Sequence, residues 1–286
     1  MSQWYVVGAD GMLARDLMQV LADNGLSARG LRRSDADITS YPRVAEALTG
    51  ADVVVNCAAF TAVDAAEEDE AAAFDVNAVG AANLARAARA NGARLVHIST
   101  DYVFAGDATQ PYGEDAAVAP RSAYGRTKAA GEWAVMAADP RNVVLRTAWL
   151  YGEHGNCFPK TIARILKERG EISVVNDQVG QPTWTLDLAR LIVDVIREEA
   201  PGGIYHGTAS GHGSWFDFAR AIASAAGIDP GAVRPTDSAS FVRPAPRPAY
   251  SVLGHHRLTA AGVEPIGDWR ERWQTAAPAV LDALAG

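Results

Sequence analysis

A phenol and an ammonium lie four residues apart in this chain, at Tyr124 and Lys128. If the segment is helical, this spacing puts both groups on one face. A phenol has an unperturbed pKa of about 10, so it becomes a useful acid–base group only when a nearby cation favours its ionised form. The chain contains only three lysines, so the pairing is informative. It predicts a catalytic Tyr–Lys pair, and the alternative is a surface helix with a solvated lysine.

A glycine turn near the start of the chain predicts a nucleotide site. Residues 3–7 are apolar and typical of a strand, and an amphipathic helical pattern follows the turn. Glycines at this place let the backbone approach a pyrophosphate, which the helix N-terminus attracts. A glycine turn after a strand is common, so the motif supports this hypothesis only together with the Tyr–Lys pair. The predicted cofactor contacts of this turn are Gly8, Gly11, Met12 and Leu13.

Two arginines indicate whether the cofactor carries a 2′-phosphate. Arg32 and Arg33 follow the second predicted strand, where an NAD-preferring domain usually carries an acid for the ribose hydroxyl. Guanidinium groups suit a 2′-phosphate, so the sequence predicts NADPH as cofactor, with NADH as an alternative. Asp37 and Ile38 are expected to flank the adenine. The competing interpretation is an exposed basic loop.

Composition favours a cytoplasmic enzyme without a nucleic-acid or membrane partner. A chain of 286 residues with 49% apolar content can bury a large core. The formal net charge of −8 argues against nucleic-acid binding. The sequence shows no cleavable signal pattern and no apolar stretch long enough to span a bilayer. Cys57 and Cys157 are typical of reduced thiols.

Apolar strands alternate with helical patterns through the first half of the chain. Strands are expected near 3–7, 27–31, 52–56, 94–98 and 142–147, with helices near 11–24, 41–49, 66–90 and 122–138. This rhythm predicts an α/β fold with a Rossmann-like, doubly wound parallel sheet. We expect an NADP-binding domain over residues 1–150, rejoined by about 184–208. A smaller α+β substrate-binding domain is expected over 151–183 and 209–286.

No metal site is predicted. The acidic run at 66–70 is expected to open the third helix, where negative charge complements the helix dipole. The six histidines show no ligand spacing, and His255 and His256 are expected in a surface loop.

Together these residues resemble the dTDP-4-dehydrorhamnose reductase family of extended short-chain dehydrogenases/reductases. The similarity covers nearly the whole chain. The Ser-Thr-Asp-Tyr-Val-Phe and Val-Asn-Asp-Gln-Val-Gly-Gln-Pro-Thr segments carry most of its specificity, whereas the glycine turn does not. The matching segments are 8–14, 55–64, 99–104, Tyr124 with Lys128, 146–152 and 175–183.

The resemblance implies roles for the central residues. Tyr124 would protonate the C4 oxygen of a sugar as hydride arrives, and Lys128 would hold the nicotinamide ribose and lower the tyrosine pKa. Thr100 would polarise the carbonyl and Asp101 would bind a sugar hydroxyl, although each is also a plausible helix cap. Residues on the ribose and nicotinamide side would be Ala59, Phe60 and Thr61.

The resemblance also implies substrate contacts in the second half of the chain. Trp149 matches the position that packs on the sugar, and a buried core indole is the equal alternative. One of Arg243 and Arg247, in a proline-stiffened segment, would grip the diphosphate. Some relatives are metal-bridged dimers, but the acidic position falls on Leu186 here, with Asp187 beside it, so no metal is carried over.

The predicted activity is NADPH-dependent reduction of the C4 keto group of a dTDP-4-keto-6-deoxy-L-hexose, first of all dTDP-4-dehydrorhamnose to dTDP-L-rhamnose. One alternative is a sister reductase for an antibiotic sugar such as dihydrostreptose. The other is a non-catalytic NADP-binding role, as in the regulatory subunit of methionine adenosyltransferase. A monomer or homodimer is expected.

Overall fold

The computed structural model describes residues 2–282 and is built around a six-stranded parallel sheet with strand order β10-β5-β4-β3-β1-β2. The residues of β1, β3 and β5 are buried throughout, as expected for a sheet covered on both faces. The predicted fold class is therefore confirmed. The strands are β1 (Trp4–Val7), β2 (Ala28–Leu31), β3 (Val53–Asn56), β4 (Arg94–Thr100), β5 (Val143–Thr147) and β10 (Gly203–His206).

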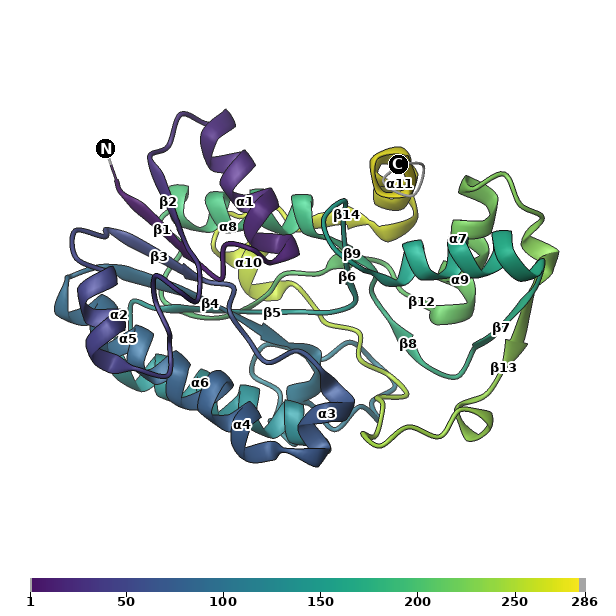
Figure 1. Ribbon diagram of the computed structural model, residues 1–286, viewed down its shortest axis with the longest axis horizontal. Coiled ribbons are helices and arrows are strands. Elements are labelled where there is room, and N and C mark those ends of the chain that lie inside the picture. Colours follow the sequence, from purple (N-terminus) through teal and green to yellow (C-terminus); the bar gives the residue numbers. More distant parts are fainter. Residues whose placement is uncertain (1, 283–286) are drawn as a thin grey trace.

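Helices cover both faces of the sheet (Figure 1). On one face lie α1 (Met12–Asp23) and α8 (Thr185–Arg197), which contact each other. On the other lie α2 (Tyr41–Ala47), α5 (Ala81–Ala90) and α6 (Ala123–Ala138). Each layer has its own apolar core, and the sheet separates the two.

The helix expected over 66–90 is instead four consecutive segments. These are α3 (Val63–Glu68), α4 (Glu70–Phe74), a π-helical turn η1 (Asp75–Gly80) and α5. Asp69 has a non-helical backbone, with φ −140° and ψ 73°, and its side chain accepts a hydrogen bond from the Ala72 N–H, so it ends α3 and caps α4. The acidic run therefore lies at a junction between helices, and the prediction that it opens the third helix is wrong. Glu67 accepts a hydrogen bond from the Ala123 N–H at the start of α6 instead.

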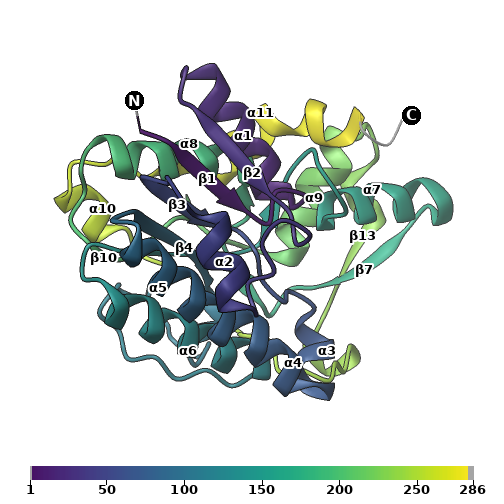
Figure 2. The same ribbon diagram turned by 60° about the vertical axis from the view of Figure 1, so that its left-hand side comes forward.

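The rest of the chain forms a smaller region beside the sheet, on the right in Figure 1 and again in the turned view of Figure 2. Its helices are α7 (Phe158–Arg169), α9 (Trp215–Ala225) and α11 (Trp269–Asp282), whereas α10 (His256–Ala260) lies beside β10 of the large sheet. Its short strands pair as β6 (Leu150–Tyr151) with β9 (Thr183–Trp184), β7 (Ile172–Val175) with β13 (Val233–Thr236), β8 (Val179–Gly180) with β12 (Gly213–Ser214), and β11 (Ala209–Ser210) with β14 (Ile266–Asp268).

The domain boundaries remain a proposal. The parallel pairing of β10 with β5 and the contact of α8 with α1 support the assignment of about 184–208 to the first domain.

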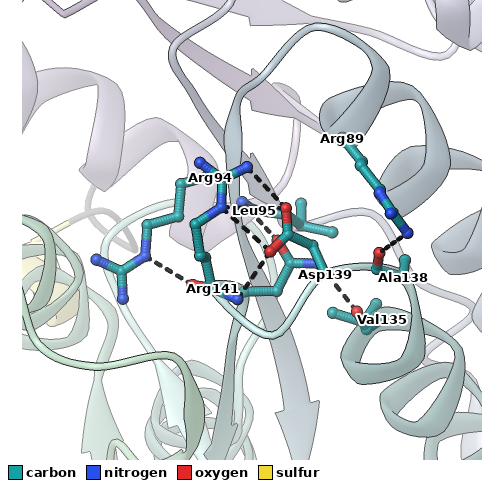
Figure 3. A network of polar contacts seen from close by, with 8 residues as sticks. Arg89, Arg94, Leu95, Val135, Ala138, Asp139 and Arg141 are labelled. Carbon is teal, nitrogen blue, oxygen red and sulfur yellow. Dashed lines mark hydrogen bonds and ion pairs between the residues drawn. The ribbon is translucent and has the colours of Figure 1, made fainter.

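At the amino ends of β4 and β5, polar contacts fasten these strands to the carboxyl ends of α5 and α6 (Figure 3). Buried Asn142 accepts a hydrogen bond from the Leu95 N–H and donates one to the Val135 carbonyl. Arg89 donates to the Ala138 carbonyl at the end of α6. These bonds set the register of β4, whose other end carries Thr100.

Among residues 2–282, every helix is too short or too polar to cross a membrane.

Candidate active site

The strands β1 to β5 deliver their carboxyl ends to one cavity of about 910 Å³, which α7 and α9 close from the smaller region. This is the size expected of a cofactor or ligand site at the switch point of a parallel sheet. Of the predicted site residues, only Arg243 and Arg247 do not line it. The predicted residues that line it are Gly8, Gly11, Met12, Leu13, Arg32, Arg33, Asp37, Ile38, Ala59, Phe60, Thr61, Thr100, Asp101, Tyr124, Lys128 and Trp149.

The glycine turn lines the cavity at the start of α1. Gly8 has φ +83°, and a Cβ there would lie 2.8 Å from the Ala58 backbone nitrogen, so a larger residue would push β1 and β3 apart. Gly11 caps α1 without a side-chain hydrogen bond, so no capping side chain covers the first N–H groups of the helix. The backbone is thus arranged to receive an anion such as a phosphate.

The two arginines after β2 lie at the cavity rim and are largely exposed. Arg32 Nε is 3.2 Å from an Asp10 carboxylate oxygen, and Arg33 Nε is 3.9 Å from Asp37. Asp10 was not among the predicted residues, although its place between the two glycines of the turn could have drawn attention to it. The guanidinium of Arg33 is the more exposed of the two, so it is freer to meet a phosphate.

Tyr124 and Lys128 lie in the first half of α6, where Ser122 caps the helix by accepting the Gly125 N–H. The Tyr124 ring meets the Tyr102 ring edge-on, with 5.6 Å between centroids. Thr100, at the end of β4, accepts a hydrogen bond from the Tyr102 N–H and donates one of 2.9 Å to Asp101 Oδ1. Thr100 is therefore a cap of the short 3-10 turn η2 (Asp101–Val103) as well as a wall of the cavity.

The pKa of Tyr124 differs from the sequence expectation. Burial raises the pKa of this phenol to about 12; the Thr100 hydroxyl opposes the rise and the Asp101 charge adds to it. Lys128 lines the same cavity, but its Nζ donates to the Ile98 carbonyl at 2.6 Å. The prediction that Lys128 lowers the tyrosine pKa is therefore wrong for this structure. At neutral pH the phenol is protonated and has a proton to donate, and a pKa of about 12 makes it a weaker acid than a free tyrosine.

Asp101 is a buried carboxyl at the cavity wall. Its Oδ2 atom has no hydrogen-bond partner among the described residues. Burial raises the pKa of Asp101 to about 6, against hydrogen bonds from Ser251 and Thr100 that lower it. This oxygen has almost no accessible surface, so a contact of Asp101 with a ligand hydroxyl stays a prediction.

Trp149 is half-buried and lines the cavity, so it is not a core indole. Its ring stacks on Trp215 from α9, with 3.6 Å between centroids and 6° between planes. Its backbone is left-handed, with φ +48°, an uncommon conformation that tertiary contacts must hold. Gly180 provides the space, since a Cβ there would lie 2.5 Å from the indole. No motif in the sequence pointed to Trp215, which lies 66 residues further along the chain.

The proline-rich segment with Arg243 and Arg247 lies beside α3. Arg247 Nη2 donates to Asp64 Oδ2 at 2.9 Å, and the Ala245 N–H donates to the other oxygen of that carboxylate. Arg243 is exposed and forms no ion pair with the described residues. A diphosphate contact of either arginine stays a prediction.

Within residues 2–282, no three His, Cys, Asp or Glu side chains form a group that could hold a metal ion. Asp187 is engaged by Arg272 at 2.7 and 2.8 Å. Both cysteines are free thiols, with Cys157 buried at the start of α7 and Cys57 at the cavity.

Comparison with known proteins identifies the family. The family described as RmlD substrate binding domain matches residues 2–282. This chain belongs to the dTDP-4-dehydrorhamnose reductase family. It is 46% identical to dTDP-4-dehydrorhamnose reductase of Mycolicibacterium smegmatis, over 97% of this chain and 86% of that protein.

Two further relatives of the family bear on substrate and cofactor. The chain is 50% identical to a probable dTDP-4,6-dihydroxy-2-methyloxan-3-one 4-ketoreductase of Streptomyces antibioticus, over 98% of this chain and 96% of that protein. The crystal structure of dTDP-4-dehydrorhamnose reductase from Bacillus anthracis in complex with NADP is 38% identical, with a TM-score of 0.93. That match covers 96% of this chain and 99% of the other.

Proposed function

We propose that this protein reduces the C4 keto group of a dTDP-4-keto-6-deoxy-L-hexose with NADPH, first of all dTDP-4-dehydrorhamnose to dTDP-L-rhamnose. The observation that carries the proposal is that Tyr124 and Thr100 line the same cavity as the glycine turn. The names of the related proteins support this substrate class, and the crystal structure of the Bacillus anthracis protein with NADP supports the cofactor.

The residues present fit a dinucleotide. The open N-terminus of α1 and the Gly8 turn would receive the pyrophosphate, and Arg32 and Arg33 the 2′-phosphate. Ala59, Phe60 and Thr61 would pack against the ribose and nicotinamide side. When bound, NADPH supplies the hydride; all other steps fall to side chains of this chain.

We propose that Tyr124, which is protonated at neutral pH and lines the cavity, donates its proton to the sugar C4 oxygen as negative charge develops there. The Thr100 hydroxyl polarises the same oxygen, and it must leave its hydrogen bond with Asp101 to do so. Asp101 and the stacked Trp149 hold the sugar through a hydroxyl and through ring contact. Lys128 orients the cofactor ribose.

A second candidate is a 4-keto reductase for another dTDP-sugar. The 50% identity to the Streptomyces antibioticus protein favours it as a specific alternative. The catalytic set would be the same, because the proton donor and the carbonyl ligand do not depend on the remaining hydroxyl groups. The wall formed by Trp149 and Trp215 would distinguish the sugars. We also propose a cytoplasmic location and a monomer or homodimer.

The test is NADPH oxidation by the purified protein with dTDP-4-dehydrorhamnose generated in place by the upstream epimerase, with the product sugar identified by NMR. Tyr124→Phe should lower kcat by about 10²- to 10⁴-fold while NADPH still binds. Formation of the C4-epimeric product, or a preference for another dTDP-4-keto sugar as substrate, would select the second candidate. Tight NADPH binding without turnover of any dTDP-4-keto sugar would contradict both and favour a regulatory role.

A further inference from the structure

Behind Lys128, on the side away from the cavity, lies a buried histidine that the proposed reaction does not use. His97 is in the middle of β4 and is 1% exposed. Its Nε2 is 3.4 Å from Lys128 Nζ, and its Nδ1 is 3.0 Å from Asn56 Nδ2. The histidine therefore connects the end of β3 with the lysine of α6.

The directions of the hydrogen bonds in this chain of contacts are determined by a backbone group. The Ala58 N–H donates to Asn56 Oδ1 at 3.0 Å, so the amide nitrogen of Asn56 must face the histidine. An amide nitrogen only donates, so His97 Nδ1 must accept. Burial holds the pKa of His97 well below its usual range, so the ring is neutral and carries its one proton on Nε2.

The Nε2–H group of His97 thus points at the Lys128 nitrogen. An ammonium has three N–H groups and no lone pair, so it has no hydrogen bond to make with this donor. A neutral amine has a lone pair that accepts the Nε2–H, while one of its own N–H groups still donates to the Ile98 carbonyl. The contact therefore stabilises the amine relative to the ammonium.

The other groups that face Lys128 are consistent with a contact that favours its neutral amine. Cys57, at the end of β3, is a neutral thiol because burial raises its pKa to about 12. Glu132, one turn further along α6, favours the ammonium, but its carboxylate is engaged by buried Arg146 of β5 at 2.7 and 2.9 Å. Burial lowers the pKa of Lys128 to about 8, the net direction that the histidine contact also favours.

We propose that His97, oriented by Asn56, is a positioning residue that presents a hydrogen-bond donor to Lys128 and so favours its neutral amine. Its importance for turnover rests on the proposed function, in which Lys128 contacts the cofactor ribose. The charge state of Lys128 does not rest on that function and can be measured without turnover.

The first experiment reads the ring directly. In protein labelled with ¹⁵N-histidine, the two ring nitrogen shifts of His97 distinguish a protonated Nε2 from a protonated Nδ1, with His97→Gln used for assignment. We expect the proton on Nε2 from pH 6 to 9. A proton on Nδ1, or a charged ring in this range, would overturn the proposal, and this reading is made on the wild-type protein.

The second experiment titrates the lysine in protein labelled with ¹³Cε-lysine, without cofactor. The chain has only two other lysines, Lys160 and Lys167 on α7, which serve as internal controls and are assigned by Lys→Arg variants. His97→Gln offers Lys128 an amide oxygen that accepts from the ammonium. We expect it to raise the Lys128 midpoint by on the order of one pH unit, with the α7 midpoints unchanged.

A second variant changes the same contact from its other end. Asn56→Asp keeps the acceptor for the Ala58 N–H, but its other carboxylate oxygen can only accept, so the ring proton of His97 moves to Nδ1 to donate to it and Nε2 becomes an acceptor for the ammonium. This variant should also raise the midpoint of the Lys128 titration. Under the proposed function, the alkaline limb of the pH profile of kcat should move to higher pH in both variants. An unchanged midpoint in both variants would refute the role of His97. Absence of dTDP-sugar turnover would refute only the proposed function, because both NMR readouts would remain.

Discussion

At Tyr124, burial and the Asp101 charge both raise the phenol pKa, and only Thr100 acts in the opposite direction. The sequence spacing suggested Lys128 as the main influence, but the lysine head group is drawn to β4, where it donates to the Ile98 carbonyl. Helical spacing brings two side chains to one face without deciding where their ends point. A reactive role for Tyr124 therefore depends on its protonated form.

Asp101 gives a pH-dependent prediction at the residue scale. Its pKa of about 6 in the folded protein lies above the ordinary value of 3.8, so the native state binds this proton more tightly than the unfolded state. The wild type therefore loses stability as pH rises from about 4 to about 6. Asp101→Asn does not titrate, and should be more stable at pH 8 by on the order of 1–3 kcal/mol.

Urea unfolding of the wild type and Asp101→Asn at pH 8, 6 and 4.5 measures this difference. The advantage of the variant should shrink towards pH 4.5, where the wild-type carboxyl is protonated. A constant difference at all three pH values would show that Asp101 does not titrate in this range.

The arginines after β2 give a prediction about cofactor choice. Replacing Arg32 and Arg33 together by glutamine should raise the KM for NADPH by about tenfold or more, because two charge-assisted contacts to a 2′-phosphate are lost. The KM for NADH should change little. Steady-state kinetics with both cofactors tests this, and an equal change in the two KM values would assign the arginines to the exposed basic loop.

At the scale of elements, we expect the amino ends of β4 and β5 to depend on one buried amide, that of Asn142. Asn142 is 1% exposed and joins β4 to α6 through Leu95 and Val135. Asn142→Ala leaves two buried backbone groups without partners and should destabilise the protein by about 2–4 kcal/mol. Urea unfolding measures the loss.

Arg141→Ala is the matched control in the same network. Its side chain is 60% exposed and pairs with Asp139 at 2.7 Å, so its removal should cost less than about 1 kcal/mol. If the control costs as much as Asn142→Ala, the buried amide is not the main fastening of these strands.

At the scale of the whole molecule, the proline-rich segment of the smaller region is held against α3 of the first by Asp64, which binds Arg247 and the Ala245 N–H. Because Arg247 is engaged in this contact, we expect Arg243 to meet the substrate diphosphate. Arg243→Ala should raise the KM for the dTDP-sugar at least about tenfold, with the KM for NADPH unchanged. Arg247→Ala should raise the KM for the dTDP-sugar less. Steady-state kinetics of the two variants tests this, and a larger increase in Arg247→Ala would identify Arg247 as the diphosphate ligand.

The fold could be predicted to a large extent because the strands of a buried parallel sheet are nearly continuous apolar runs, as in residues 53–56 and 143–147. The break of the 66–90 helix could not, because Asp69 acts through a local side-chain bond that competes with a strong helical pattern. Trp215 could not be assigned to the cavity either, since its stacking on Trp149 joins segments far apart in the chain.

The sequence by itself determined the parallel sheet, the family and the residue types near the cavity, because periodicity and motifs are local properties of the chain. Only the tertiary structure decided the pKa values and hydrogen bonds of these residues. Burial of Tyr124, Asp101 and Lys128 shifts each pKa by removing water from the charged form. The direction of the Ala58–Asn56–His97 hydrogen bonds likewise follows from strands brought side by side, which no single segment of the sequence contains.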